Sequence, residues 1–188
     1  MVSEYAMVSG SLGAVARQGN VSLAESFIGA TAIVLCDVSG SMAAKDSRGG
    51  LSRYDVLLQE LGQLQSSLPG KLAILAFSDS CIFVPGGEPP FMGSGTDLAA
   101  ALRFAKVADG VGATFLVISD GCPDDQQEAL DVARTFRSRI DSIFVGPENN
   151  RESGREFLAR LATASGGKTL TADRLALLSE KAAQLLLN

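Results

Sequence analysis

Short, uninterrupted runs of apolar residues alternate with segments of helical periodicity from residue 31 onward, and this alternation limits the possible folds most strongly. A continuous apolar run is typical of a strand that is buried on both faces. The predicted strands cover 31–36, 71–77, 82–84, 114–119, 140–145 and 168–170. The pattern predicts an α/β fold, a doubly wound and mostly parallel sheet with helices on both faces. The short run 82–84 is expected to be an antiparallel strand at the sheet edge.

Segments between these strands repeat apolar residues at helical spacing. The predicted helices cover 51–68, 96–107, 125–137, 154–164 and 173–187. Ser52 and Asp55 match a capping box at the start of the first helix, and Pro69 ends it.

Residues 1–30 break the alternation, because they are rich in Ser, Gly and Ala and have weak periodicity. They are compatible with an extra strand, a docking arm or a disordered leader. Apolar residues make up 46% of the sequence, which is enough for one well-buried core. We therefore expect an N-terminal extension over 1–30 and a single domain over 31–188.

The charged and sulfur-containing residues exclude several classes of function. With no histidine, the chain lacks Ser-His-Asp and Cys-His catalysis, HExxH zinc hydrolysis and every imidazole metal site. A formal net charge of −5 argues against a nucleic-acid partner, which needs a basic face. The three cysteines have no CxxC spacing, and their odd number favours a reducing compartment over a disulfide framework.

Targeting signals are also absent from the sequence. The N-terminus has no basic region ahead of an apolar stretch, so it does not match a signal peptide. No apolar run approaches the roughly 20 residues of a membrane helix. We expect a cytoplasmic protein without a membrane partner.

Polar residues stand where the predicted strands end, and in an open doubly wound sheet ligands bind beyond the carboxyl ends of the strands. Asp37, Ser39 and Ser41 follow the first strand, and Asp120 follows the strand 114–119. Thr96 ends a Gly-rich loop before a helix. In the usual strand order the two aspartates follow neighbouring strands, so both carboxylates are expected to face one crevice.

Two carboxylates and three hydroxyls form an all-oxygen donor set, which suits a hard cation. Mg²⁺ fits best because it keeps several waters and needs few carboxylates, and Mn²⁺ is an alternative. If one carboxylate acts through water, the metal keeps excess positive charge. An Asp or Glu side chain from a partner protein would then complete its coordination.

The pentapeptide DVSGS at 37–41 resembles the DxSxS signature of the von Willebrand factor type A domain, which also occurs in integrin inserted domains. Thr96 in GTD and Asp120 in SDG match the second and third metal-site loops of that family. The resemblance covers residues 31–187. It implies a metal-ion-dependent adhesion site whose ligands, directly or through water, are Asp37, Ser39, Ser41, Thr96 and Asp120.

Three functions follow from this interpretation. The first is a non-catalytic module that binds an acidic side chain of a partner through the metal. The second is an accessory subunit of an ATPase or chelatase-like assembly; because the chain has no GxxxxGK[ST] loop, ATP use would belong to the partner. The third is a magnesium-dependent phosphatase of the haloacid-dehalogenase type, which requires a second carboxylate at the position of Ser39 and is therefore disfavoured.

Other residues near these loops have structural as well as functional interpretations. Asp97 is expected to cap its helix or to brace the metal loops. The acidic run Asp124, Asp125 and Glu128 is expected to form a helix N-terminus rather than a second metal site. Cys122 is expected to be inert, although its position would also suit a reactive thiol at the metal mouth. Phe91 and Met92 could form an apolar rim at the binding surface or pack beneath their loop.

Overall fold

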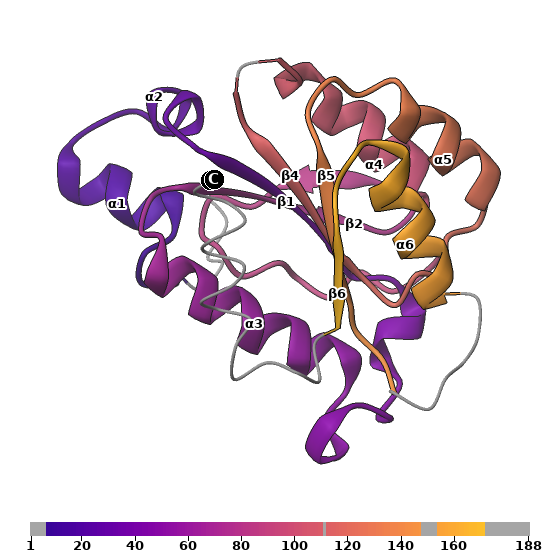
Figure 1. The fold of residues 1–188 in the computed structure, drawn as a ribbon. Helices are drawn as coiled ribbons and strands as arrows, with labels where there is room; N and C mark the ends of the chain where they lie inside the picture. Colours follow the sequence, from indigo (N-terminus) through magenta and orange to yellow (C-terminus); the bar gives the residue numbers. More distant parts are fainter. Residues whose placement is uncertain (1–6, 111, 148–153, 172–188) are drawn as a thin grey trace.

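A six-stranded sheet forms the centre of the computed structural model, which describes residues 7–110, 112–147 and 154–171 (Figure 1). The strand order is β3-β2-β1-β4-β5-β6, and every neighbouring pair is parallel except the antiparallel pair β2–β3. The strands are β1 Ala32–Asp37, β2 Leu72–Phe77, β3 Cys81–Phe83, β4 Thr114–Ser119, β5 Ile140–Phe144 and β6 Thr169–Thr171. The predicted fold class, including the short antiparallel edge strand, is confirmed.

The central strands are apolar throughout because both faces of the sheet are covered. Every residue of β1 and β2 is buried. Ile33 and Leu35 of β1 pack into an apolar cluster on one face, whereas Val34 and Cys36 pack into a second cluster on the other face. This double burial removes the hydrophobic-polar alternation that a half-exposed strand would show.

Helices cover both faces, as the periodicity predicted (Figure 1). The helix α3 (Arg53–Ser67) packs on one face, and α4 (Leu98–Ala105), α5 (Gln126–Arg134) and α6 (Gly154–Ala164) pack on the other. No helix within the described ranges combines the length and hydropathy needed to cross a membrane. The predicted helix 173–187 lies outside the described residues.

Side chains at the helix starts explain most of the boundaries. Ser52 and Asp55 form the expected capping box at α3, with both main-chain N–H groups accepted by side chains. Asp97 and Asp125 cap α4 and α5, so these helices begin one residue after each aspartate. The prediction that α4 begins at residue 96 was therefore slightly early.

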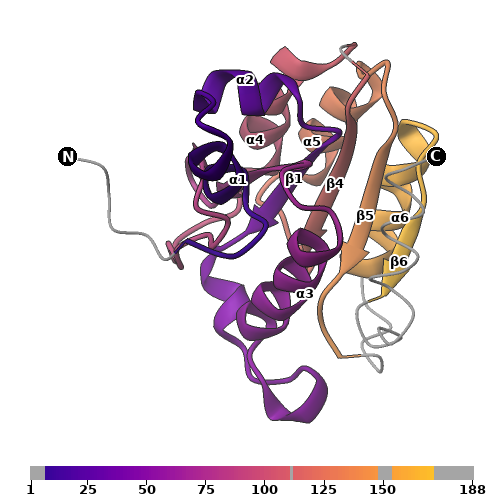
Figure 2. The same cartoon turned by 90° about the vertical axis from the view of Figure 1, so that its left-hand side faces the viewer.

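The N-terminal segment forms two short helices, α1 (Leu12–Gly19) and α2 (Leu23–Ile28), which lie together beside the sheet (Figure 2). Leu12 is 2% exposed and belongs to the same apolar cluster as α4 and α5. The N–H of Gly13 donates to the carbonyl of Pro85 at 2.8 Å. Residues 7–30 thus form neither an added strand nor a disordered leader.

Replacing Leu12 with Ala is expected to lower the free energy of unfolding by about 2–5 kcal/mol, because it leaves a cavity in the core cluster. Urea unfolding measures this change. Ile28→Ala in the neighbouring helix serves as the control, since Ile28 is 82% exposed and its truncation should change stability by less than about 0.5 kcal/mol. Equal effects of the two substitutions would show that α1 is not part of the cooperative fold.

Candidate metal centre at the carboxyl edge of the sheet

Three loops meet where β1 and β4 end, and main-chain hydrogen bonds tie them together. The N–H of Gly40, after β1, donates to the carbonyl of Ser94 at 3.1 Å. The N–H of Asp124, after β4, donates to the carbonyl of Thr96 at 3.1 Å. A Cβ at position 40 would lie 3.3 Å from the Ser94 oxygen, a tight contact that glycine at this position avoids.

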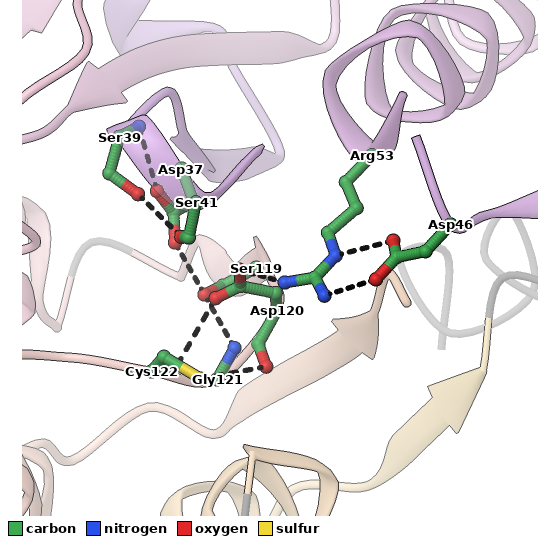
Figure 3. A network of polar contacts seen from close by, with 9 residues as sticks. All are labelled: Asp37, Ser39, Ser41, Asp46, Arg53, Ser119, Asp120, Gly121 and Cys122. Atoms are coloured by element: carbon green, nitrogen blue, oxygen red, sulfur yellow. Dashed lines mark hydrogen bonds and ion pairs between the residues drawn. The ribbon is translucent and has the colours of Figure 1, made fainter. Parts of the chain in front are cut away.

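Asp37 lies at the floor of this edge with no exposed surface (Figure 3). Its Oδ1 accepts a hydrogen bond from the N–H of Ser39 at 3.0 Å, and its Oδ2 accepts one from the Ser119 hydroxyl at 2.6 Å. Burial raises the pKa of Asp37 to about 6, while the hydrogen bonds from Ser119 and Ser39 act in the opposite direction. The carboxylate is therefore largely ionised at neutral pH.

The hydroxyls of Ser39 and Ser41 converge above this carboxylate (Figure 3). Their Oγ atoms are 3.2 Å apart. Ser39 is fully buried, whereas Ser41 is exposed in the 3₁₀ turn Gly40–Ala43. The cluster therefore has a buried floor at Asp37 and opens to solvent on the Ser41 side.

Thr96 is 5% exposed and is held by its main chain. Its N–H donates to Oδ2 of Asp124 at 2.9 Å, and the N–H of Gly95 before it donates to Oδ1 of Asp79 at 2.9 Å. Asp79 also accepts from the Ser94 hydroxyl. The Thr96 hydroxyl makes no hydrogen bond to another described residue, so its oxygen is available to a ligand.

Asp120 forms a buried ion pair that the sequence did not indicate (Figure 3). Its Oδ2 lies 2.6 Å from Nη1 of Arg53, on the first turn of α3. Side-chain exposure is 1% for Asp120 and 13% for Arg53. Asp46 binds the other side of the guanidinium through Nε at 2.9 Å and Nη2 at 2.6 Å. The hydrogen bonds to Asp46 raise the pKa of Arg53 most, and the hydrogen bond to Asp120 raises it further.

Ser119 joins the two aspartate positions, because β1 and β4 are neighbours as predicted. Its hydroxyl donates to Asp37 and accepts from the N–H of Gly121 at 2.9 Å. Among the five predicted site residues, Asp37, Ser39 and Ser41 are linked by direct contacts. Asp120 directly follows Ser119, whose hydroxyl contacts Asp37. Thr96 lies in the loop of Ser94, whose carbonyl accepts a hydrogen bond from the loop after β1.

Four residues of this edge were not among the predicted site residues: Arg53, Ser119, Asp79 and Asp124. Ser119 was placed in its strand, but only the parallel pairing shows that its side chain meets Asp37. Asp124 was assigned with Asp125 to a helix N-terminus; Asp125 caps α5, whereas Asp124 holds Thr96. The sequence signal for Asp79 was its position, two residues after the end of the buried strand β2.

The structure shows the surroundings of Cys122, Phe91 and Met92. Partial burial raises the pKa of the Cys122 thiol, and Asp120 raises it further, which favours the protonated thiol. The Phe91 ring is 46% exposed and packs edge-to-face on Tyr54, with centroids 5.4 Å apart. Met92 packs against the apolar cluster beneath α3. Phe91 is thus a half-exposed ring beside α3, and Met92 is a packing residue.

The donor atoms at this edge fit a hard cation. Within the described ranges, no three Asp, Glu or Cys side chains gather as a metal site, so a cation would depend on hydroxyl oxygens as well as carboxylates. Each oxygen of Asp37 accepts one hydrogen bond and keeps another lone pair. An all-oxygen set with few carboxylates is the kind that Mg²⁺ accepts.

Solved structures with low sequence identity share this fold. An aerotolerance-related membrane protein from Bacteroides fragilis aligns with a TM-score of 0.67 and 16% identity, over 85% of this chain and 99% of that one. The manganese-loaded TRAP protein from Plasmodium vivax aligns with a TM-score of 0.57 and 17% identity, over 80% and 72% of the two chains. A von Willebrand factor type A structure from Catenulispora acidiphila gives 0.55 and 17%, over 84% and 42%.

No protein-family model and no curated protein matches the sequence. The structural alignments nevertheless show that the chain has the mixed, mostly parallel sheet of the von Willebrand factor type A fold.

Replacing Arg53 with Gln is expected to lower the free energy of unfolding by about 3–5 kcal/mol, because it leaves the buried Asp120 carboxylate without a cation. Urea unfolding in the presence of EDTA measures the loss. Asp46→Asn is the matched control, since it changes the partly exposed partner of the same guanidinium and should cost about 0–1 kcal/mol. A loss for Arg53→Gln as small as that of the control would contradict the dependence of Asp120 on Arg53.

Proposed function

We propose that the chain is a non-catalytic protein-binding module that uses a divalent cation to bind an Asp or Glu side chain of a partner. Mg²⁺ is the proposed metal and Mn²⁺ the alternative. Its proposed ligands, direct or through water, are Asp37, Ser39, Ser41, Thr96 and Asp120. The observation that carries the proposal is the buried Asp37 carboxylate beneath two converging serine hydroxyls.

The charges around the cluster favour an acidic ligand. Arg53 offsets the charge of Asp120, so among the proposed ligands Asp37 is the carboxylate that forms no ion pair with another described residue. With these two carboxylates as its only charged ligands, a divalent ion would keep net positive charge. Because a cation attracts an anion strongly where water is partly excluded, a carboxylate from a partner would be a favoured further ligand.

Structural similarity adds support without assigning a ligand to this chain. The Plasmodium vivax protein is manganese-loaded in its solved structure. Its fold is that of the present chain, and the oxygen donors described above occupy the carboxyl edge of the sheet. We therefore infer that the cation is bound at this edge.

A magnesium-dependent phosphatase remains disfavoured by the local chemistry. Position 39 is a serine whose hydroxyl faces Ser41, so it offers no carboxyl group to act as general acid beside Asp37. An accessory role in an ATPase assembly is a variant of the proposed function, and the identity of the partner would distinguish the two. We also propose a cytoplasmic location, consistent with the cysteine spacing in the sequence.

Mn²⁺ titration followed by electron paramagnetic resonance, with competition by Mg²⁺, tests the metal site. Ser119→Ala should weaken binding by roughly 10–100-fold, because Ser119 orients Asp37 from outside the ligand set. Asp37→Ala should weaken it further, since a ligand is removed. Asp131→Ala, on the exposed face of α5, should leave affinity unchanged. Equal affinities of the wild type and Asp37→Ala would place any bound metal elsewhere.

Capture of partners from native lysate on the immobilised protein tests the adhesive role. A specific partner should be retained by the wild type in Mg²⁺ and released by EDTA, while Asp37→Ala should retain none. A partner that is still retained in EDTA and by Asp37→Ala would show that recognition occurs away from the metal site. Turnover of p-nitrophenyl phosphate that is lost in Asp37→Ala would instead support the phosphatase.

A further inference from the structure

The edge strand β3 has main-chain groups that point away from the sheet. The N–H of Val84 donates to the carbonyl of Ile74, and the N–H of Ser78 donates to the carbonyl of Ser80. With the register of β2 and β3, these bonds direct the N–H and C=O groups of Ile82 toward β2. The corresponding groups of Cys81 and Phe83 therefore face outward, at the open edge.

Residues 7–30 of the N-terminal segment form main-chain hydrogen bonds to this edge only beyond β3. The carbonyl of Pro85 accepts from the N–H of Gly13 at 2.8 Å, and that of Gly86 accepts from the N–H of Val8 at 2.9 Å. Within the described residues, no such main-chain hydrogen bond reaches Cys81 or Phe83. The outward N–H and C=O groups of Cys81 and Phe83 can therefore pair with two residues of an added strand and form up to four main-chain hydrogen bonds.

An apolar groove of about 440 Å³ lies beside this edge, between β3 and the helices α1 and α2. Three of its lining side chains, Met7, Val21 and Leu23, are 42%, 46% and 44% exposed. Scattered exposed apolar residues are common in proteins, but these three gather around one cavity next to unpaired main chain. The groove can therefore receive apolar side chains of a segment that pairs with β3.

Arg17 gives the groove its charge. This exposed side chain lines the groove, and it forms no ion pair with another described residue. The chain as a whole has a net charge of −5, so an isolated cation here favours a ligand with a nearby acidic group.

We propose that the open edge of β3 and the adjoining groove bind an extended segment of a partner protein, which adds to the sheet as a further strand. Outward main-chain groups of Cys81 and Phe83 pair with the segment, alternate apolar side chains enter the groove, and an Asp or Glu faces Arg17. This surface is independent of the proposed metal site, since none of the five proposed ligands lines it.

Phage-displayed random peptides, selected on the immobilised full chain and then synthesised with a fluorescent label, provide the probe. Selected peptides should alternate apolar and polar residues and should carry an acidic residue. Cys81→Pro removes one outward N–H at the first residue of the strand and should weaken binding at least about tenfold. Cys81→Ala makes a similar change in side-chain size, keeps the N–H and should bind like the wild type.

Charge and main-chain contacts have separate tests with the same peptides. Arg17→Glu should weaken binding at least about tenfold, whereas Arg155→Glu on α6 should not. Amide exchange followed by NMR should show new protection at Cys81 and Phe83, while Ile82 keeps its existing protection. These readouts remain informative if Cys81→Pro fails to fold.

Four results would overturn the proposal. Selection could yield no peptide, or peptides that bind Arg17→Glu as well as the wild type without protecting Cys81 and Phe83. Alternatively, light scattering could reveal a concentration-dependent dimer that Cys81→Pro abolishes, which would make a second copy of the chain the occupant. Loss of peptide binding in Asp37→Ala or in EDTA would assign recognition to the metal site.

Discussion

A carboxylate without exposed surface controls the architecture of the carboxyl edge. Asp37 ends a strand that has neighbours on both sides and apolar clusters on both faces, so water cannot satisfy its oxygens. A buried ionised group is tolerated only when nearby donors replace its hydration. The main chain of Ser39 and the hydroxyl of Ser119 supply these donors, and their positions fix the loops that follow β1 and β4.

The second buried carboxylate is stabilised in a different way. Asp120 is paired with Arg53, which is itself held by Asp46, so a chain of alternating charges runs from the buried edge to solvent. Asp120 is therefore neutralised by the protein itself, whereas the donors to Asp37 among the described residues are all neutral. The two carboxylates therefore differ in their electrostatic surroundings, although the sequence motif assigns both to one ligand set.

The sequence was most informative where structure depends on local pattern. The buried strands and the Ser52 capping box could be predicted because each depends on residues that are close in the chain. The pairing of Arg53 with Asp120 spans 67 residues and has no local signature. The helices α1 and α2 were missed although Ser11 and Ser22 cap them, because both helices are short and α1 is built largely from small residues.

The hydrogen bond from Ser119 to Asp37 also bears on how the chain folds. It joins residues 82 positions apart, across a parallel pair of strands. Contacts of such high sequence separation form only after a large loop has closed, and parallel pairing is intrinsically slow. A partly folded chain, with β2 and α3 formed but β4 not yet docked, would lack the group that orients Asp37. We therefore expect the cluster to be complete only after β1 and β4 have paired.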